Sequence, residues 1–384
     1  MTALRFERKP LRFAAARLAG AIMPGRGASV GPLSLSGDGP PALPGADWVH
    51  VRPILSGICG SDLALIDGTA SAYFDPLVSY PFTPGHEVLG TVTAADGTTR
   101  RVALVPVLSC VTRGIDPVCR QCAAGRINLC ERIGFGHLQE GLQTGFCADT
   151  GGGWSTGLVA HTSQLIDVPD DLSDEAGVMI EPTACAVHAA EAYTGEQTVI
   201  IGAGTVGLLT LAAITATRDA VRKAPIIVTA RYAEQKRLAK QLGADVVCSS
   251  DEMPRYVRSA TQSLVYGDQL SCGVPHVIDC VGSSDSLQQA LRVVAPRGEV
   301  QVVGMPSNVS LELTSLWHRE VAIRGCYAYT HADFHTAIDV IRRHDLGRLV
   351  SATYPLADYT DAIAHAASAG RRGATKIAFD MRSS

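Results

Sequence analysis

The sequence of 384 residues carries little charge, because only 18% of its residues are Asp, Glu, Lys or Arg. The formal net charge is −4, so it has no surplus of basic residues of the kind that neutralises nucleic-acid phosphates. Intrinsic disorder is also excluded, since 46% of the residues are hydrophobic and disordered chains combine low hydrophobicity with high charge. The sequence therefore predicts a globular protein without a nucleic-acid partner, and the length favours two domains.

The sequence also lacks a recognisable signal peptide and a convincing membrane span. Its long uncharged run, residues 198–217, contains Gly202, Gly204 and Gly207, which favours a buried strand, a turn and a helix over a span. Residues 13–33 are rich in Ala and Gly and faintly resemble a transit peptide, but we interpret them as a surface loop or hairpin. We expect a cytoplasmic protein with no membrane partner.

Cysteine is the unusual component, with eleven residues in the chain. An odd number cannot close into a simple set of disulfides, and a core of this size needs no disulfides for stability. Metal binding or catalysis in a reducing compartment is therefore the first interpretation.

The tightest cysteine group is Cys119, Cys122 and Cys130. The C-x-x-C spacing allows two thiolates to bind one tetrahedral zinc ion, and the third cysteine follows closely. A closed structural site needs a fourth ligand. Cys110 is the preferred candidate, because thiolate suits zinc well, and Asp116 is the alternative.

The pattern of predicted secondary structure changes along the chain. Short β-branched runs among Gly and Pro indicate a β-rich first half, whereas strands alternate with helices after about residue 185. Short apolar runs predict strands at residues 199–201, 226–230, 276–280 and 300–304, which is typical of a parallel sheet. We expect one domain at residues 1–185 and 327–384, with a zinc lobe at about 106–132, and an inserted domain at 186–326.

Gly202, Gly204 and Gly207 form a G-x-G-x-x-G motif between an apolar run and a helix that begins with Thr205 and Val206. The first glycine permits a tight turn, the second lets a diphosphate approach the backbone, and the third lets the helix pack on the strand. The N-terminus of the helix then faces the negative charge. The motif predicts a dinucleotide site.

The end of the second strand distinguishes between the two nicotinamide cofactors. An NAD site places Asp or Glu there to bind the ribose hydroxyls, but this chain has Ala230, followed by Arg231 and Tyr232. The missing carboxylate removes repulsion of a 2′-phosphate, and Arg231 can pair with that phosphate. We therefore favour NADP(H) over NAD(H).

Further motifs are dispersed along the chain. Together with the glycine loop and the cysteine group, they resemble the zinc-dependent medium-chain dehydrogenase/reductase family, nearest its sorbitol, threonine and glucose dehydrogenase branch. The resemblance extends over residues 48–380 and depends on the order and spacing of the motifs. The residues of the dispersed motifs are Cys59, Ser61, Asp62, His86, Glu87 and Glu181.

The resemblance implies an α/β fold in which a β-rich, GroES-like catalytic domain accompanies a Rossmann domain with a doubly wound parallel sheet. It implies that Cys59 and His86 are ligands of a catalytic zinc, with Glu181 as the third ligand and Glu87 as the alternative. One further position stays open for water or substrate. Asp62 resembles the carboxylate that orients the zinc-bound imidazole.

By the same resemblance, the reaction is hydride transfer between NADP(H) and an alcohol, with zinc lowering the pKa of the alcohol. The substrate is expected to be a secondary alcohol, polyol or sugar, and the product a ketone or aldehyde. Ser61 resembles a proton-relay hydroxyl, but Ala64 stands where many members have a histidine. The backbone at Val281 and Gly304 corresponds to the family's nicotinamide contacts. A homodimer or homotetramer is expected.

Two other functions fit part of this pattern. A zinc-independent reductase of the same fold would reduce an activated alkene or a carbonyl with NADPH, and a catalytically silent sensor would only bind NADPH. The joint presence of Cys59, His86 and Glu181 argues against both. Metal analysis should find about two zinc ions per chain under the leading hypothesis.

Overall fold

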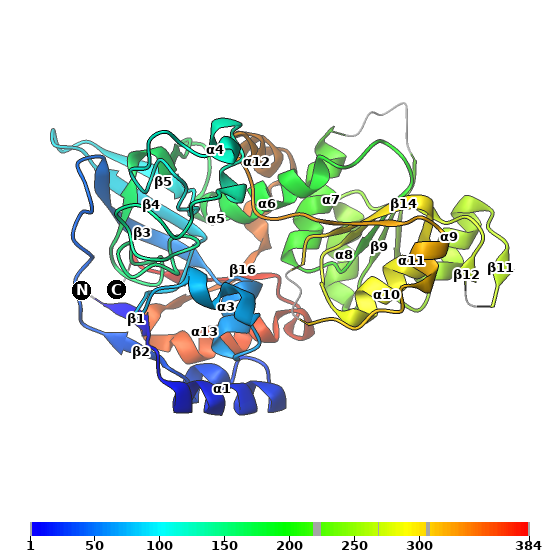
Figure 1. Ribbon diagram of the computed structural model, residues 1–384, viewed down its shortest axis with the longest axis horizontal. Helices are drawn as coiled ribbons and strands as arrows, with labels where there is room; N and C mark the ends of the chain where they lie inside the picture. The colour runs from blue at the N-terminus through cyan, green and yellow to red at the C-terminus, as the bar shows by residue number, and fades with distance from the viewer. Residues whose placement is uncertain (1, 218–223, 268, 305–307, 383–384) are drawn as a thin grey trace. The chain divides into compact units, whose positions relative to one another are not determined.

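The computed structural model describes residues 2–217, 224–267, 269–304 and 308–382 (Figure 1). The chain forms two compact units. One runs to Glu181 and resumes at Tyr329, and we call it the split unit; the other, Pro182–Ala328, is the inserted unit. The sequence pattern predicted the exchange between them at residues 185 and 327.

The split unit is built on a sheet in the order β16-β17-β3-β4-β5-β7, with β6 also paired to β3. Neighbouring strands are antiparallel except β16 and β17. Because β17 pairs with β3, the end of the chain lies beside the strand that leads to Cys59. The strands are β3 (Trp48–Gly57), β4 (Val88–Thr93), β5 (Thr99–Leu104), β6 (Leu158–His161), β7 (Leu165–Asp167), β16 (Val350–Pro355) and β17 (Lys376–Asp380).

Short helices flank this sheet and its long loops. They are α3 (Gly60–Ile66), α4 (Arg120–Ala123), α5 (Asp174–Val178), α12 (His331–His344) and α13 (Tyr359–Ala367). A separate core that contains Trp154 and Phe379, whose rings meet edge to face, lies between α3, α13 and β17. α6 (Ile180–Ala190) begins with the last residues of the first segment of this unit.

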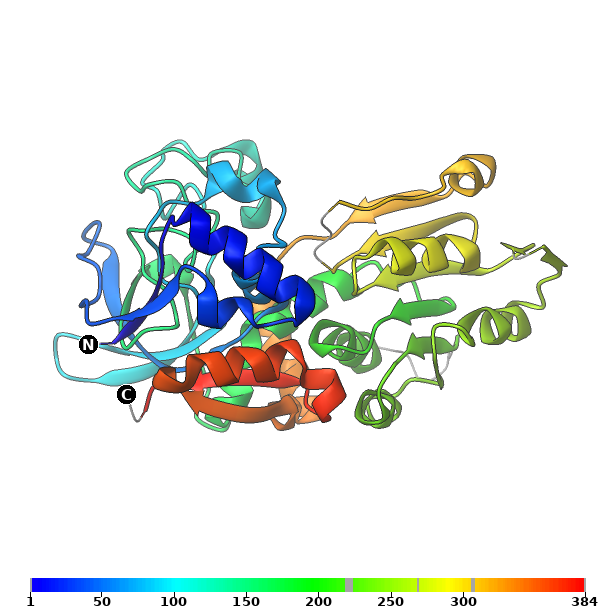
Figure 2. The same ribbon diagram turned by 90° about the horizontal axis from the view of Figure 1, so that it is seen from below.

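The interpretation of residues 13–33 as a loop or hairpin was wrong. Strands β1 (Ala3–Phe6) and β2 (Leu33–Ser36) pair antiparallel, and the chain between them forms two helices, α1 (Pro10–Ile22) and α2 (Gly27–Val30). Figure 2 shows α1 in dark blue on the surface of the split unit. The alanines that suggested a transit peptide are strong helix formers, which explains the difference.

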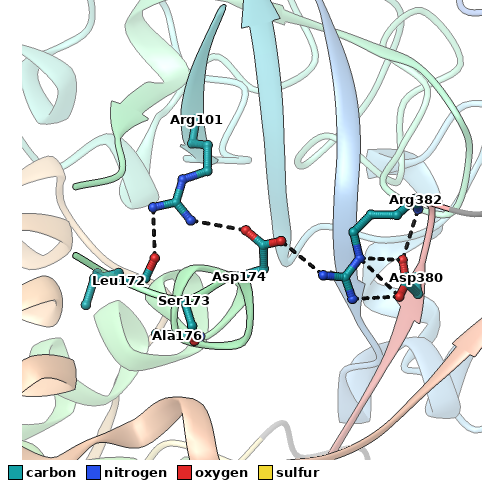
Figure 3. A network of polar contacts seen from close by, with 7 residues as sticks. All are labelled: Arg101, Leu172, Ser173, Asp174, Ala176, Asp380 and Arg382. Atoms are coloured by element: carbon teal, nitrogen blue, oxygen red, sulfur yellow. Dashed lines mark hydrogen bonds and ion pairs between the residues drawn. The ribbon is translucent and has the colours of Figure 1, made fainter. Parts of the chain in front are cut away.

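An ion-pair network connects the last strand to the rest of the split unit (Figure 3). Arg101 of β5 and Arg382 both bind Asp174, which lies in the first turn of α5, at 3.1 Å each. Arg382 also donates to both carboxylate oxygens of Asp380. A negative charge in the first turn of a helix is favourable because the backbone N–H groups there are unpaired.

The inserted unit has a fully parallel sheet in the order β10-β9-β8-β13-β14-β15. Numbered from β8, this is the 3-2-1-4-5-6 order of a Rossmann fold. The strands are β8 (Thr198–Ile201), β9 (Ile226–Thr229), β10 (Val246–Cys248), β13 (Val274–Asp279), β14 (Val294–Val302) and β15 (Ala322–Gly325). The helices are α7 (Thr205–Thr217), α8 (Ala233–Gln241), α9 (Met253–Thr261), α10 (Ser284–Val293) and α11 (Thr314–His318). Two short strands, β11 (Val265–Tyr266) and β12 (Gln269–Leu270), pair antiparallel with each other.

The four strands expected in this region are all present, and β8 and β9 are buried along their whole length, as a central parallel sheet requires. The uncharged run at 198–217 forms β8, a turn and α7. Among the described residues, no helix combines the length and the apolarity that a membrane crossing requires.

Candidate active site

Four thiols of the split unit converge, and we call them the cysteine lobe. The sulfurs of Cys110, Cys119, Cys122 and Cys130 all lie within 4.8 Å of one another. Cys119 is the N-cap of α4, which places Cys122 one turn along the same side. Asp116, the alternative fourth ligand, is exposed and is not part of the group.

Backbone N–H groups point at these sulfurs. Those of Cys122 and Glu131 donate to the Cys119 sulfur at 3.5 Å each. Burial raises the pKa of the Cys119 thiol, but these donors outweigh it and lower the pKa to about 6. For Cys122, burial raises the pKa. One acidic thiol beside three further thiols is the chemistry of a closed tetrathiolate zinc site.

Arg113 organises the loop around the lobe. Its side chain is fully buried and donates to five backbone carbonyl groups between residues 108 and 141. Nη1 serves three of these carbonyls, while Nε and Nη2 serve one each, so all three nitrogens of the guanidinium are used. The residues between Cys110 and Cys119 are thereby held in one conformation.

A second group, which we call the mixed cluster, consists of Cys59, His86 and Glu87. One potential ligand atom of each lies within 4.8 Å of the other two. Cys59 is the N-cap of α3, and its N–H donates to Asp62 at 2.9 Å. His86 and Glu87 directly precede β4 and are nearly inaccessible to solvent.

Asp62 lies beside the imidazole of His86. Its Oδ1 is 3.6 Å from His86 Nδ1, and the carboxylate is completely buried. Burial raises the pKa of Asp62 and lowers that of His86, but the carboxylate and Cys59 reverse the direction for His86 and raise its pKa well above the ordinary value. Negative charge on Asp62 and Cys59 favours a proton on the imidazole of His86, and it would also favour a metal cation bound beside that ring.

Lys376, the first residue of β17, forms an ion pair with Glu87. Both side chains are buried, and Lys376 also donates to the Ile58 carbonyl at 3.1 Å. The burial of Lys376 lowers its pKa, and the Glu87 carboxylate more than restores it. Gly57 makes this approach possible, because a Cβ atom there would lie 1.8 Å from Glu87 Oε2.

Glu181 lies near this cluster but is not part of the group within 4.8 Å. The Tyr329 hydroxyl donates to its Oε1 at 2.8 Å, and both side chains are buried. Burial raises the pKa of Glu181 to about 7, although the neighbouring His86 lowers it. Glu181 is therefore a carboxyl group poised between its charged and neutral forms.

Both clusters fit zinc. In the part of the chain that the structure describes, Asp62 Oδ1 and His86 Nδ1 have no other polar partner and face each other at 3.6 Å, so the carboxylate is placed to orient the imidazole of a metal ligand. The mixed cluster offers thiolate, imidazole and carboxylate, the ligand types of catalytic zinc. The cysteine lobe offers four thiols and no further polar ligand, which is typical of structural zinc.

The dinucleotide motif of the inserted unit has the geometry that its sequence predicts. Gly202 has φ +93°, and its N–H donates to Thr229 Oγ1 at 3.0 Å. A Cβ atom at Gly207 would lie 1.8 Å from the Gly202 carbonyl oxygen, so only glycine fits there. Gly204 faces open space, which leaves room for a phosphate at the N-terminus of α7.

Thr205 and Val206 are half-buried in the first turn of α7. Val281 and Gly304 follow the carboxyl ends of β13 and β14, and a Cβ at Gly304 would meet the Val281 backbone at 2.5 Å. β13 is the neighbour of β8 and β14 follows it, so these residues lie at the carboxyl end of the sheet, the usual place for a ligand of a doubly wound fold.

The residues after β9 differ in exposure. Ala230 is buried, whereas Arg231 is exposed and its guanidinium carbon lies 5.6 Å from the centre of the Tyr232 ring. Neither Ala230 nor its two successors provides a carboxylate. The guanidinium is available for an anionic group of a ligand.

Ser61 is half-buried in the first turn of α3, two residues after Cys59, and Ala64 follows one turn later. Lys376 and Tyr329 were not among the expected site residues. They lie 289 and 148 positions from Glu87 and Glu181, and no local motif marks them. Only the pairing of β17 with β3 suggests the position of Lys376.

Comparisons with known proteins agree on one family. Residues 45–170 match the alcohol dehydrogenase GroES-like domain, and residues 206–343 match the zinc-binding dehydrogenase family. L-idonate 5-dehydrogenase from Vitis vinifera is 31% identical over 297 residues, which cover 73% of each chain. Sorbitol dehydrogenase from Arabidopsis thaliana is 30% identical over 293 residues, covering 73% of this chain and 74% of the relative. A zinc-binding dehydrogenase structure from Sinorhizobium meliloti, bound to NADP, has a TM-score of 0.70 and 25% identity, covering 91% of this chain and 96% of the other.

Proposed function

Because the chain belongs to the zinc-dependent medium-chain alcohol dehydrogenases, in the branch of the sorbitol dehydrogenases, we propose that it interconverts a secondary alcohol, polyol or sugar with its ketone or aldehyde by using NADP(H). Its enzymatic class, an oxidoreductase that uses a nicotinamide cofactor, follows from the family. The substrate class follows the names of the polyol and sugar-acid dehydrogenases that it resembles.

The convergence of Cys59, His86 and Glu87 within 4.8 Å, with Cys59 half-buried and the other two buried, carries this proposal. A reductase without catalytic zinc would have no need to bring a thiol, an imidazole and a carboxylate together at one point, and a silent sensor would have none either. When bound, zinc polarises the substrate oxygen and the nicotinamide ring accepts or donates the hydride.

The residues of the chain have distinct parts in this proposal. Cys59 and His86 hold the zinc, and Asp62 fixes the orientation of the imidazole. The Ser61 hydroxyl takes the substrate proton and passes it towards solvent, with water in place of the histidine that is absent at Ala64. The cysteine lobe binds the second, structural zinc through Cys110, Cys119, Cys122 and Cys130.

Two carboxylates compete for the third catalytic ligand position. Membership of the mixed cluster supports Glu87, whereas the ion pair of Glu87 with Lys376 supports Glu181. The variants Glu87→Gln and Glu181→Gln separate them. The variant that loses about one zinc ion per chain, measured by elemental analysis after dialysis, identifies the ligand.

The preference for NADP(H) is supported by Ala230 and the exposed Arg231. We expect KM to be at least about tenfold lower for NADP⁺ than for NAD⁺, and the difference to disappear in Arg231→Ala, because one phosphate–guanidinium pair is lost. The matched control is Arg255→Ala, a basic residue of α9 in the same unit. A lower KM for NAD⁺ in the unaltered enzyme would contradict the proposal.

The remaining properties are proposed on the same basis. A panel of polyols, sugars and secondary alcohols, with turnover measured by NADPH absorbance, identifies the substrate. Turnover that survives Cys59→Ala would favour a zinc-independent reductase. We propose a homodimer or homotetramer, to be measured by light scattering. The absence of disulfides among the eleven cysteines supports a cytoplasmic location.

A further inference from the structure

Helix α1 has an inverted amphipathic pattern. Its buried residues are the small ones, Ala16 and Gly20, whereas Leu11, Leu18 and Ile22 are 88%, 71% and 81% exposed. A surface helix ordinarily turns its large apolar side chains inward. At about 100° per residue, the three exposed residues fall within about 40° of one another, on the side opposite Ala16 and Gly20.

The small residues explain how α1 is held. A Cβ atom at Gly20 would lie 2.6 Å from the Asp67 Cβ, so the helix backbone lies directly against the end of α3. The buried Asp67 carboxylate then accepts hydrogen bonds from the N–H groups of Gly25 and Gly27, at 2.7 and 3.1 Å. The exposed aliphatic stripe is therefore a fixed feature of the split unit.

The stripe lies in a strongly basic segment. Residues 8–37 contain five basic residues and no carboxylate, and of the five only Lys9 forms an ion pair in the described part of the chain, with Glu7 just outside this range. In the described part of the chain, Arg12 and Arg17 form no ion pair, and at about 100° per residue they flank the stripe on both sides. The five residues are Arg8, Lys9, Arg12, Arg17 and Arg26.

We propose that α1 attaches the enzyme to a membrane surface that contains anionic phospholipid. A convex aliphatic stripe can enter the boundary between headgroups and acyl chains, while the flanking arginines pair with lipid phosphates. A second copy of this chain fits less well because two such basic faces repel, and a nucleic acid leaves the aliphatic side chains without a partner. The attachment is peripheral, and it differs from the membrane-free protein that the sequence predicted.

The test is co-sedimentation of the full-length, zinc-loaded enzyme with vesicles of phosphatidylcholine, with and without phosphatidylglycerol. We expect at least about tenfold stronger retention on the anionic vesicles, falling as salt is raised. The triple variant Leu11→Ser/Leu18→Ser/Ile22→Ser should lose about tenfold or more of this retention, because the stripe no longer enters the bilayer. Arg12→Gln/Arg17→Gln should reduce retention and its salt dependence.

A matched control replaces three exposed aliphatic residues of the inserted unit, Leu264→Ser/Val309→Ser/Leu313→Ser, and should bind vesicles as the unaltered enzyme does. Alcohol oxidation should be unchanged in all variants, since α1 contributes no residue to the proposed site. Equal retention on both vesicle types, or unchanged retention of the α1 serine variant, would overturn the proposal. So would an oligomer that the α1 serine substitutions dissociate while the unaltered enzyme fails to bind vesicles.

Discussion

The cysteine lobe and the mixed cluster lie in the same unit but are assembled in opposite ways. The four thiols come from 21 consecutive positions, 110–130, and are oriented by backbone N–H groups of the same loop. The mixed cluster joins segments near residues 59 and 86. Lys376, which binds the Ile58 carbonyl 318 positions away, packs against it. A local site can be closed and chemically uniform, whereas an assembled one can combine different groups around an open position.

The largest expected effect is a loss of catalysis when the mixed cluster is altered. Cys59→Ala should lower kcat by a factor on the order of 10⁴, equivalent to about 5 kcal/mol, because Lewis-acid polarisation of the substrate is lost. Steady-state kinetics and zinc analysis should show loss of one metal with the lobe still loaded. Cys272→Ala, at an exposed thiol of the inserted unit, is the control and should leave both values unchanged.

Removing a lobe ligand should affect stability instead. Cys119→Ser should lower the free energy of unfolding by about 4 kcal/mol, since loss of a structural metal is among the most destabilising changes. Thermal unfolding followed by circular dichroism measures this. The kcat of molecules that remain folded should stay within about twofold of the original; a collapse of kcat at full stability would mean that the lobe takes part in the reaction.

The assembled site contains a buried ion pair, which the lobe lacks. Lys376→Met should destabilise the protein by about 3 kcal/mol, because the buried Glu87 carboxylate loses its partner. Urea unfolding should show most of this stability restored in the double variant Lys376→Met/Glu87→Gln. If the double variant is as unstable as the single one, packing of the lysine stem is the cause, not its charge.

A smaller effect is expected at the carboxylate behind the imidazole. Asp62→Asn should reduce kcat/KM by about 10- to 100-fold, because the amide keeps the shape but orients and polarises His86 poorly. Zinc affinity, measured with a competing chelator, should fall in parallel. The control is Asp285→Asn, an acidic residue in the first turn of α10 in the inserted unit. Unaltered zinc affinity in Asp62→Asn would separate this carboxylate from the metal.

The smallest effect concerns the network that holds β17 in place (Figure 3). Arg382→Ala should cost about 0.5 kcal/mol at neutral pH, as is usual for exposed ion pairs. Hydrogen bonding to Arg382 lowers the pKa of Asp380, so the stabilisation is present above the unfolded pKa of about 3.9 and is lost as the pH falls through the folded value. Urea titrations at neutral and acidic pH should show the difference disappear.

The same contrast between local and assembled features explains what could be predicted from the sequence. The cysteine lobe and the glycine loop have short-range spacings, and the structure brings those residues together, including Cys110 in preference to Asp116. The Rossmann sheet was predictable because its strands are continuous apolar runs. The dispersed candidates Cys59, His86 and Glu181 came only from the order of family motifs, and the structure brings Glu87 rather than Glu181 into the group with the first two.

Other features could not be predicted from local patterns. The partners Lys376 and Tyr329 are set by tertiary pairing, and a lysine at the start of a strand is ordinarily exposed. Helix α1 was missed because residues 13–33 were interpreted from their alanine and glycine content, although Leu11, Leu18 and Ile22 recur at the helical period. Its small buried residues are informative only once Asp67 is seen beside them.

The pairing of β17 with β3 has a consequence for the order of events during translation. Ribosomes add about 5–20 residues per second, so roughly 15–60 seconds separate the synthesis of Glu87 from that of Lys376. During that interval the complete inserted unit emerges, and Glu87 exists without its cationic partner. The nascent chain therefore cannot form the Glu87–Lys376 pair until the whole inserted unit has been synthesised.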